Sequence, residues 1–246
     1  MIVVLPLVLV VVIPAVYLAA IALVPVEPGA GVPQGIASLL PERITALPYK
    51  QALYYAFTVL LCPMLFLAVP IICSVASASC VFVSEKENGT LETLLLSSMD
   101  PKLIYNSKTS GCILLSLVVS VISFIAFAIT AGVGDILLSV PFFFNFEWLV
   151  LIFLLTPAVS FFGVSFVSCN INRVYSTGES LQTMGYLILP FILLFLMQFS
   201  GLFYLNALLL LILAILIAVA AVILFNFSAR RFHAEWLLSE LRGNAQ

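Results

Sequence analysis

Residues 81–108, VFVSEKENGTLETLLLSSMDPKLIYNSK, place a short charged segment between two long apolar runs. Glu85, Lys86, Glu87 and Glu92 lie close together there, in a chain that is only 8% charged. Charged side chains are strongly disfavoured inside a bilayer, so such a segment belongs in water. We therefore expect it to be the surface on which this protein meets a partner in the aqueous phase.

The segment also has the signals of a short helix. Gly89 permits a tight turn, and Thr90 is a good N-cap for a helix over residues 91–98. Asp100 and Pro101 form a second start signal, because an aspartate N-cap is here followed by proline at the first helical position. At i, i+3, i+4 spacing, one face of the short helix carries three leucines, which are Leu91, Leu94 and Leu95. We predict a short amphipathic helix that lies crosswise between two spanning helices.

This segment resembles the first cytoplasmic loop of type-2 ABC exporter permeases, most closely the branch with sodium-efflux and peptide-antibiotic-efflux permeases. The resemblance rests on Glu85-Lys86-Glu87-Asn88-Gly89-Thr90-Leu91-Glu92, then Leu94-Leu95 and Lys108, against a family pattern of roughly E-K-E-x-G-T-L-E-x-L-L. In that family the helix docks on a separate ATPase subunit. The residues that the resemblance assigns to this coupling element are Glu85, Glu87, Gly89, Thr90, Leu91, Glu92, Leu94 and Leu95.

The composition indicates an integral membrane protein. Hydrophobic residues make up 64% of the 246 residues, whereas soluble domains have about 45–50%. A spanning helix needs about 20 apolar residues, so we predict an all-α fold with one membrane domain over residues 1–246. The six expected spans are about 2–24, 63–83, 113–131, 149–168, 184–201 and 208–225.

The apolar region 51–84 is too long for one span and barely long enough for two. We place one span at 63–83 and expect residues 51–62 to be an interfacial or tilted extension. Tyr54 and Tyr55 would anchor that extension at the membrane surface.

Polar and aromatic positions add expectations for the third and fourth spans. Ser116, Ser120 and Ser123 lie along one stripe, and such small polar residues favour helix packing over a substrate path. Asp135 falls in a predicted connector, 132–147. An aromatic cluster follows it and is typical of an interfacial belt; its members are Phe142, Phe143, Phe144, Phe146 and Trp148. We expect residues 170–183 to form a polar loop.

The basic residues predict the orientation in the plasma membrane. With a cytoplasmic start, the cytoplasmic segments would hold Lys86, Lys102, Lys108, Arg173, Arg230, Arg231 and Arg242, and the external segments Arg43 and Lys50. This positive-inside bias places the charged segment and both termini in the cytoplasm.

The tail predicts an amphipathic helix on the membrane surface. Residues 228–238 carry Arg230, Arg231 and Trp236 just after the last expected span, and basic residues there suit an anionic cytoplasmic leaflet. The stretch is also similar to the ending of the same permease branch.

The sequence lacks the motifs of an enzyme. It has no G-x-x-x-x-G-K-[ST] loop and no H-E-x-x-H pair, and its cysteines have no metal-ligand spacing. We expect no cofactor or metal in this chain. The resemblance implies that ATP and magnesium bind to the partner ATPase. No ionisable residue falls in the middle of an expected span, which weakens the hypothesis of an ion-driven transporter.

The resemblance implies a permease subunit of an ATP-driven exporter, in which a second permease subunit pairs with this one. Apolar walls favour a peptide, lipid-like or amphipathic substrate. Family members normally begin with a basic amphipathic helix, whereas the first span is expected to start at Ile2 here. Two alternatives stay open: a non-transporting immunity or sensor subunit that docks a cytoplasmic partner, and an ion-driven secondary transporter.

Overall fold

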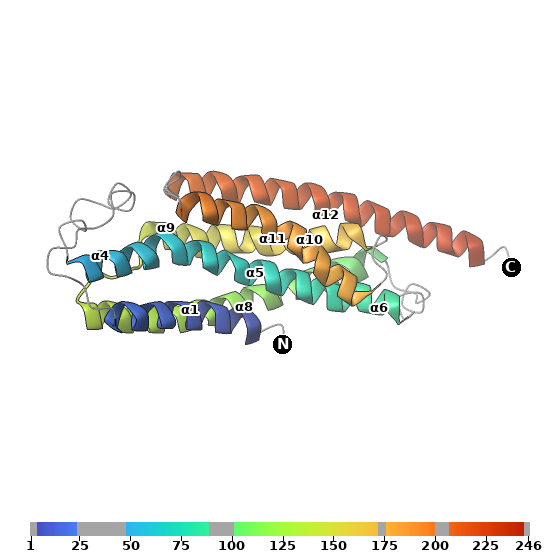
Figure 1. The fold of residues 1–246 in the computed structure, drawn as a ribbon. Helices are drawn as coiled ribbons and strands as arrows, with labels where there is room; N and C mark the ends of the chain where they lie inside the picture. The colour runs from blue at the N-terminus through green and yellow to red at the C-terminus, as the bar shows by residue number, and fades with distance from the viewer. Residues whose placement is uncertain (1–3, 24–47, 89–100, 172–175, 200–206, 244–246) are drawn as a thin grey trace.

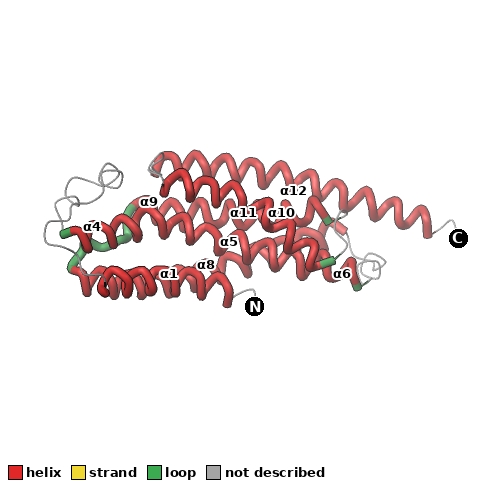
Figure 2. Tube along the Cα trace, in the orientation of Figure 1, coloured by secondary structure: helices red, strands yellow, loops and turns green. Residues whose placement is uncertain are grey.

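The computed structural model describes residues 4–23, 48–88, 101–171, 176–199 and 207–243. These segments are helical apart from short turns, and no strand occurs among them. The helices lie side by side with their axes along one common direction (Figure 1). Figure 2 shows the same bundle with the described loops confined to its ends.

The helices alternate in direction along the chain. Their bounds, in order, are α1 (Val4–Leu23), α4 (Tyr49–Ala56), η1 (Phe57–Leu61), α5 (Cys62–Ala78), η2 (Ser79–Val83), α6 (Ser84–Glu87), α8 (Pro101–Leu138), α9 (Phe146–Val150), η3 (Leu151–Leu155), α10 (Thr156–Asn170), α11 (Thr177–Phe199) and α12 (Ala207–Gly243). The segments α4 to α6 follow one another without a break, as do α9 to α10. In Figure 1 α6 and the end of α12 lie toward one end of the bundle, and α4 and α9 lie toward the other.

Five of these continuous helices are long and apolar enough to cross a membrane. They are Tyr49–Val83, Lys102–Leu138, Phe146–Asn170, Thr177–Gln198 and Ala207–Ala229, and α1 adds a shorter apolar segment, Val8–Ile21. The prediction of an all-α protein with several helices long and apolar enough to span a membrane is confirmed for the described residues. The predicted start of a helix at Pro101 is also correct.

The second long helix differs from the prediction because it continues through Pro63. Proline removes a backbone N–H and its ring collides with the carbonyl four residues back. The five-residue π-helix η1 comes directly before this point, and the Cys62 N–H reaches the Phe57 carbonyl five residues earlier. A second π-helix, η3, precedes Pro157, and there the Thr156 N–H donates a hydrogen bond to the Leu151 carbonyl. Each wider turn lets a helix pass its proline unbroken.

The expectation that Tyr54 and Tyr55 anchor the extension 51–62 at the membrane surface is wrong. Tyr54 and Tyr55 are buried, where they pack with Val140 and with Ile21 of α1. The Tyr54 hydroxyl donates a hydrogen bond to the Ala131 carbonyl on α8 at 3.1 Å. These tyrosines therefore join α4 to α8 inside the protein and do not anchor it at the membrane surface.

The bundle core is organised around α10, which packs against α5, α8 and α12. Two of the five aromatic residues assigned to the predicted interfacial belt lie in the core instead. Phe142, Phe144 and Phe146 are exposed, but Phe143 and Trp148 are buried. The Trp148 ring stacks on Phe127 of α8 with centroids 5.0 Å apart, so these two aromatic residues stabilise the core.

The predicted packing role of the serine stripe is confirmed. Ser116, Ser120 and Ser123 are all buried on α8. The Ser116 hydroxyl donates to the Pro70 carbonyl at 3.2 Å and lies 3.0 Å from the Ser160 hydroxyl of α10. One small side chain thus links three helices, which requires their backbones to approach closely.

Other helices are also longer than predicted, and α8 continues past residue 131 to Leu138, inside the expected connector 132–147. The expected loop 170–183 is wrong for its second half, because α11 already begins at Thr177. The last helix continues without interruption through the predicted tail to Gly243, and it extends beyond the bundle in Figure 1. The backbone of the tail is therefore helical, as expected, but it continues the last helix and is not a separate one.

Candidate functional site

The charged segment begins where α6 is fastened to α8. Lys108 Nζ forms an ion pair with Glu85 Oε2. The Lys108 and Glu85 side chains are 16% and 30% exposed, so the pair is partly shielded from water and less weakened by solvent than a fully exposed pair. This contact joins the end of the second long helix to the first turns of the third.

A second acidic residue fastens α6 to α11. Glu87 Oε2 accepts hydrogen bonds from the Thr177 backbone N–H at 3.0 Å and from the Thr177 hydroxyl at 3.1 Å. The first N–H groups of a helix lack partners within the helix, and a negative charge is favourable beside them. Glu87 therefore supplies a cap to α11 from a neighbouring helix.

The start of α11 has its own capping residues as well. Ser176 Oγ accepts the Glu179 backbone N–H at 3.2 Å, which is one half of a capping box of the form S-x-x-E. One turn further on, the hydroxyls of Ser180 and Ser79 lie 2.7 Å apart, and both residues are buried. This contact joins α11 to η2, the segment that directly precedes α6.

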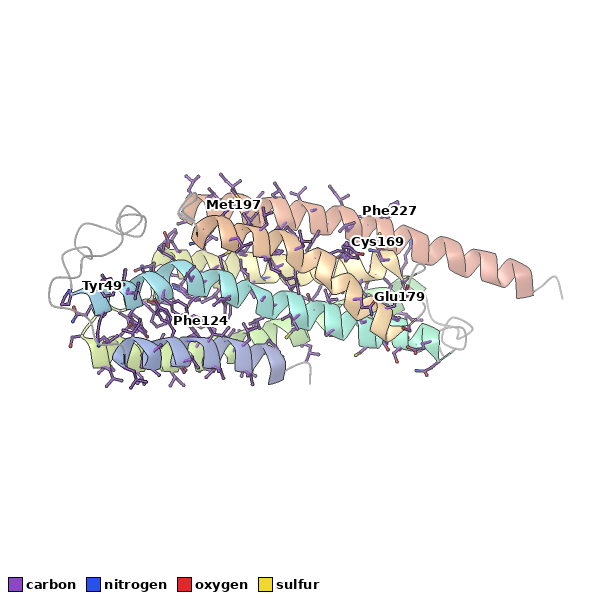
Figure 3. All side chains as sticks on the ribbon, viewed as in Figure 1. Tyr49, Phe124, Cys169, Glu179, Met197 and Phe227 are labelled. Atoms are coloured by element: carbon purple, nitrogen blue, oxygen red, sulfur yellow. The ribbon has the colours of Figure 1, made fainter. Side chains whose placement is uncertain are left out.

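We call this group of residues the α6 clasp: Ser79, Glu85, Glu87, Lys108, Thr177 and Ser180. It connects the ends of three long helices at one end of the bundle. The side-chain view in Figure 3 places Glu179, next to these residues, at the opposite end from Tyr49. A force applied to the chain after α6 would therefore act on α8 and α11 together.

The described residues include only part of the predicted coupling element. Glu85 and Glu87 both belong to the clasp, and the more distant of their two partners lies 90 positions away in the sequence. The other predicted coupling residues lie outside the described residues: Gly89, Thr90, Leu91, Glu92, Leu94 and Leu95. The tail positions Arg230, Arg231 and Trp236 lie on α12, but their side chains are outside the described set.

The clasp residues of α11 were not identified from the sequence. Thr177 and Ser180 were assigned to a loop, although the S-x-x-E pattern from Ser176 to Glu179 is a recognisable start signal. The pairing of Glu87 with Thr177 has no local signal, because it depends on how two distant helices pack.

The opposite end of the bundle holds a buried carboxylate that the sequence placed in a connector. Asp135 lies in the last turn of α8 and is 5% exposed. Its Oδ2 accepts the Phe143 backbone N–H at 3.0 Å, and its backbone carbonyl accepts the Val140 N–H at 3.0 Å. The side chain and main chain of one residue thus hold the turn between α8 and α9.

The described residues offer no metal centre, since no group of three His, Cys, Asp or Glu side chains gathers among them. Comparison with known protein families, curated proteins and solved structures gives no match for this chain. The site is therefore characterised by its own geometry: a set of polar contacts that link helix ends.

Proposed function

We propose that this chain is the transmembrane permease subunit of a type-2 ABC exporter. The chain would couple ATP hydrolysis by a separate ATPase subunit to the efflux of a peptide, lipid-like or amphipathic substrate. ATP and magnesium would bind to the ATPase, and this chain would perform no catalysis itself. A second permease subunit would complete the membrane domain.

The observation that carries the proposal is the α6 clasp. The segment that resembles an ATPase-docking loop starts at Glu85, and this residue and Glu87 each bind a different helix. A docking loop can transmit motion only if it is attached to the helices that must move. The two acidic residues supply such attachments on α8 and α11.

The mechanism follows from this attachment. ATP-driven closure of the ATPase subunits would push on residues 89–100, and the clasp would pass the displacement to the ends of α8 and α11. Packed helices shift as rigid bodies between discrete arrangements, and the ATP-bound partner would favour one of them. α11 suits such a movement, because it is the least buried of the five candidate spans.

The proposed membrane arrangement has six spans, with α1 as the first. The charged segment and both termini lie in the cytoplasm of this arrangement, as the basic residues predict. The short amphipathic helix over residues 91–98 would be the element that the ATPase grips. The tail of α12 would continue the last span into the cytoplasm from the inner surface of the plasma membrane.

Purification from mild detergent tests the proposal. An ATPase subunit should co-purify with the chain, and the reconstituted complex should move substrate in an ATP-dependent manner. Glu92→Ala and Gly89→Pro should reduce the coupling between ATP hydrolysis and transport while insertion stays normal. Glu147→Gln, at the other end of the bundle, is the matched control and should transport like the unaltered chain.

Three results would overturn the proposal. Substrate-stimulated ATPase activity that is unchanged in both loop variants would remove the coupling role. A partner bound at the loop without ATP-dependent transport would instead identify an immunity or sensor subunit. Transport that follows an ion gradient without any ATPase would identify a secondary transporter.

A further inference from the structure

We propose that Asp135 is a proton-binding site, and that its protonation closes the turn at the end of the bundle opposite the α6 clasp. This inference does not depend on the proposed transport function. It concerns the chain alone and starts from one carboxylate that is buried without an adequate set of hydrogen-bond partners.

The two oxygens of Asp135 have different surroundings. Oδ2 accepts the Phe143 N–H, whereas Oδ1 is fully buried and has no hydrogen-bond partner among the described residues. An ionised carboxylate in an apolar interior needs a cation or several donors to offset its lost hydration. Asp135 has one donor, so this arrangement suits the neutral acid.

The groups around Asp135 supply no counter-charge in the described part of the chain. From α4, Tyr54 is the titratable side chain that faces it, and its hydroxyl already donates to the Ala131 carbonyl. Lys50 on α4 and Glu147 on α9 are the other described charged side chains at this end, and neither forms an ion pair with Asp135.

A proton fits this site better than a metal ion. It needs no further ligands, whereas a metal ion would need several oxygen, nitrogen or sulfur atoms, and no such group gathers among the described residues. The proton would come from water at this end of the bundle, form the O–H bond at Oδ1, and return to water on release. No other bond changes in this step.

Release of the proton would open the turn. The ionised Oδ1 would draw water to the end of α8, and this water would separate the Phe143 ring from α8. The Phe143 N–H would stay bonded to Oδ2, because an ionised carboxylate accepts a hydrogen bond more strongly than a neutral acid. The Phe143 ring packs edge-on against Trp148 with centroids 5.8 Å apart. Trp148 is 1% exposed, so it reports this opening by becoming hydrated.

The composition allows the protonation of Asp135 and the opening of the turn to be measured directly. Asp100 and Asp135 are the two aspartates of the chain, and Trp148 and Trp236 are its two tryptophans. The double variant Asp100→Asn with Trp236→Phe, labelled with carbon-13 at the aspartate carboxyl, isolates one signal of each kind. The chain would be titrated in lipid nanodiscs, without a partner, by carbon-13 NMR and tryptophan fluorescence.

We expect the carboxyl resonance of Asp135 to follow a single-proton titration. Trp148 emission should shift to longer wavelength as pH rises, with the same midpoint. In the same background, Asp135→Asn should keep the short-wavelength emission at every pH, because asparagine is neutral and its oxygen can still accept the Phe143 N–H. Glu147→Gln is the matched control and should retain the shift.

The proposal is overturned if Asp135 shows no titration, if Trp148 emission does not follow it, or if Asp135→Asn retains the shift. Should Asp135→Asn fail to fold, the coincidence of the two curves in the chain that keeps Asp135 still decides the matter. None of these outcomes involves the ATPase, so failure here is distinct from failure of the proposed function.

Discussion

Gly163 lies where α10 packs closely against α5. Replacing it by alanine should destabilise the bundle. A Cβ at this position would lie 2.1 Å from Ser74 Oγ, 3.1 Å from Ser74 Cβ and 3.5 Å from a methyl group of Val75. The first distance is far below van der Waals contact, so Ser74 must rotate or the two helices must separate.

The distances set the size of the effect. Rotating the Ser74 hydroxyl removes the worst contact but breaks its 3.0 Å hydrogen bond to the Ile71 carbonyl. The Cβ–Cβ contact at 3.1 Å remains. Overpacking a core of this kind costs about 1–3 kcal/mol, so Gly163→Ala should lower the free energy of unfolding by that amount.

The assay is unfolding by SDS titration in mixed micelles, with Ser74→Ala as the second arm of a double-mutant cycle. Ser74→Ala removes the hydroxyl that Gly163→Ala would strike, so the double variant should recover at least half of the loss. Gly111→Ala is the matched control, because nothing lies within 4 Å of its added Cβ. It should be neutral or stabilise α8 by up to about 1 kcal/mol.

The reasoning would be refuted by a Gly163→Ala variant as stable as the unaltered chain. Strict additivity of Gly163→Ala and Ser74→Ala would refute it as well, because residues in direct contact are expected to be coupled.

Three further substitutions test single contacts. Tyr54→Phe removes the buried hydrogen bond to Ala131 and should cost about 0.5–1.5 kcal/mol in the same SDS titration; an unchanged midpoint would contradict the contact. Ser116→Ala removes the hydroxyl that links Pro70 to α10 and should cost about 1–3 kcal/mol, because polar partners stay buried. Equal stability of the alanine variant would exclude this linking role. Glu87→Ala removes the cap on α11 and should cost about 0.5–1 kcal/mol, with faster amide exchange confined to the first turn of that helix; exchange unchanged there would count against the clasp.

Sequence patterns located the helices well where a strong local signal is present. Asp100-Pro101 marked the beginning of α8 correctly, because an N-cap followed by proline acts within one turn. The packing role of Ser116 also followed from its spacing with Ser120. Both predictions depend on residues near one another in the chain.

The errors came from tertiary packing that local patterns do not contain. Pro63 was expected to begin a span, but η1 accommodates it within a longer helix. Phe143 and Trp148 were assigned to a surface belt with their exposed neighbours, since composition alone cannot distinguish which aromatic side chains of a run turn inward. Asp135 was placed in a connector because no local pattern reveals its burial, which depends on α4 and on the turn after α8.

The candidate site was likewise predicted only in part. Glu85 and Glu87 were selected by their resemblance to a docking loop, and the structure describes both. Their partners Lys108 and Thr177 are 23 and 90 positions away, and their pairing with the two acidic residues was not predicted because it follows from the order in which the helices pack.

Photocrosslinking at Asn88 tests the central claim most directly. Asn88 is exposed and directly follows α6, so a photoreactive side chain there would lie at the start of the proposed docking segment. The account predicts an adduct in cells with a nucleotide-binding ATPase, identified by mass spectrometry, and no such adduct from Phe142 at the other end. An adduct with the ATPase at Phe142, or its absence at Asn88, would contradict it.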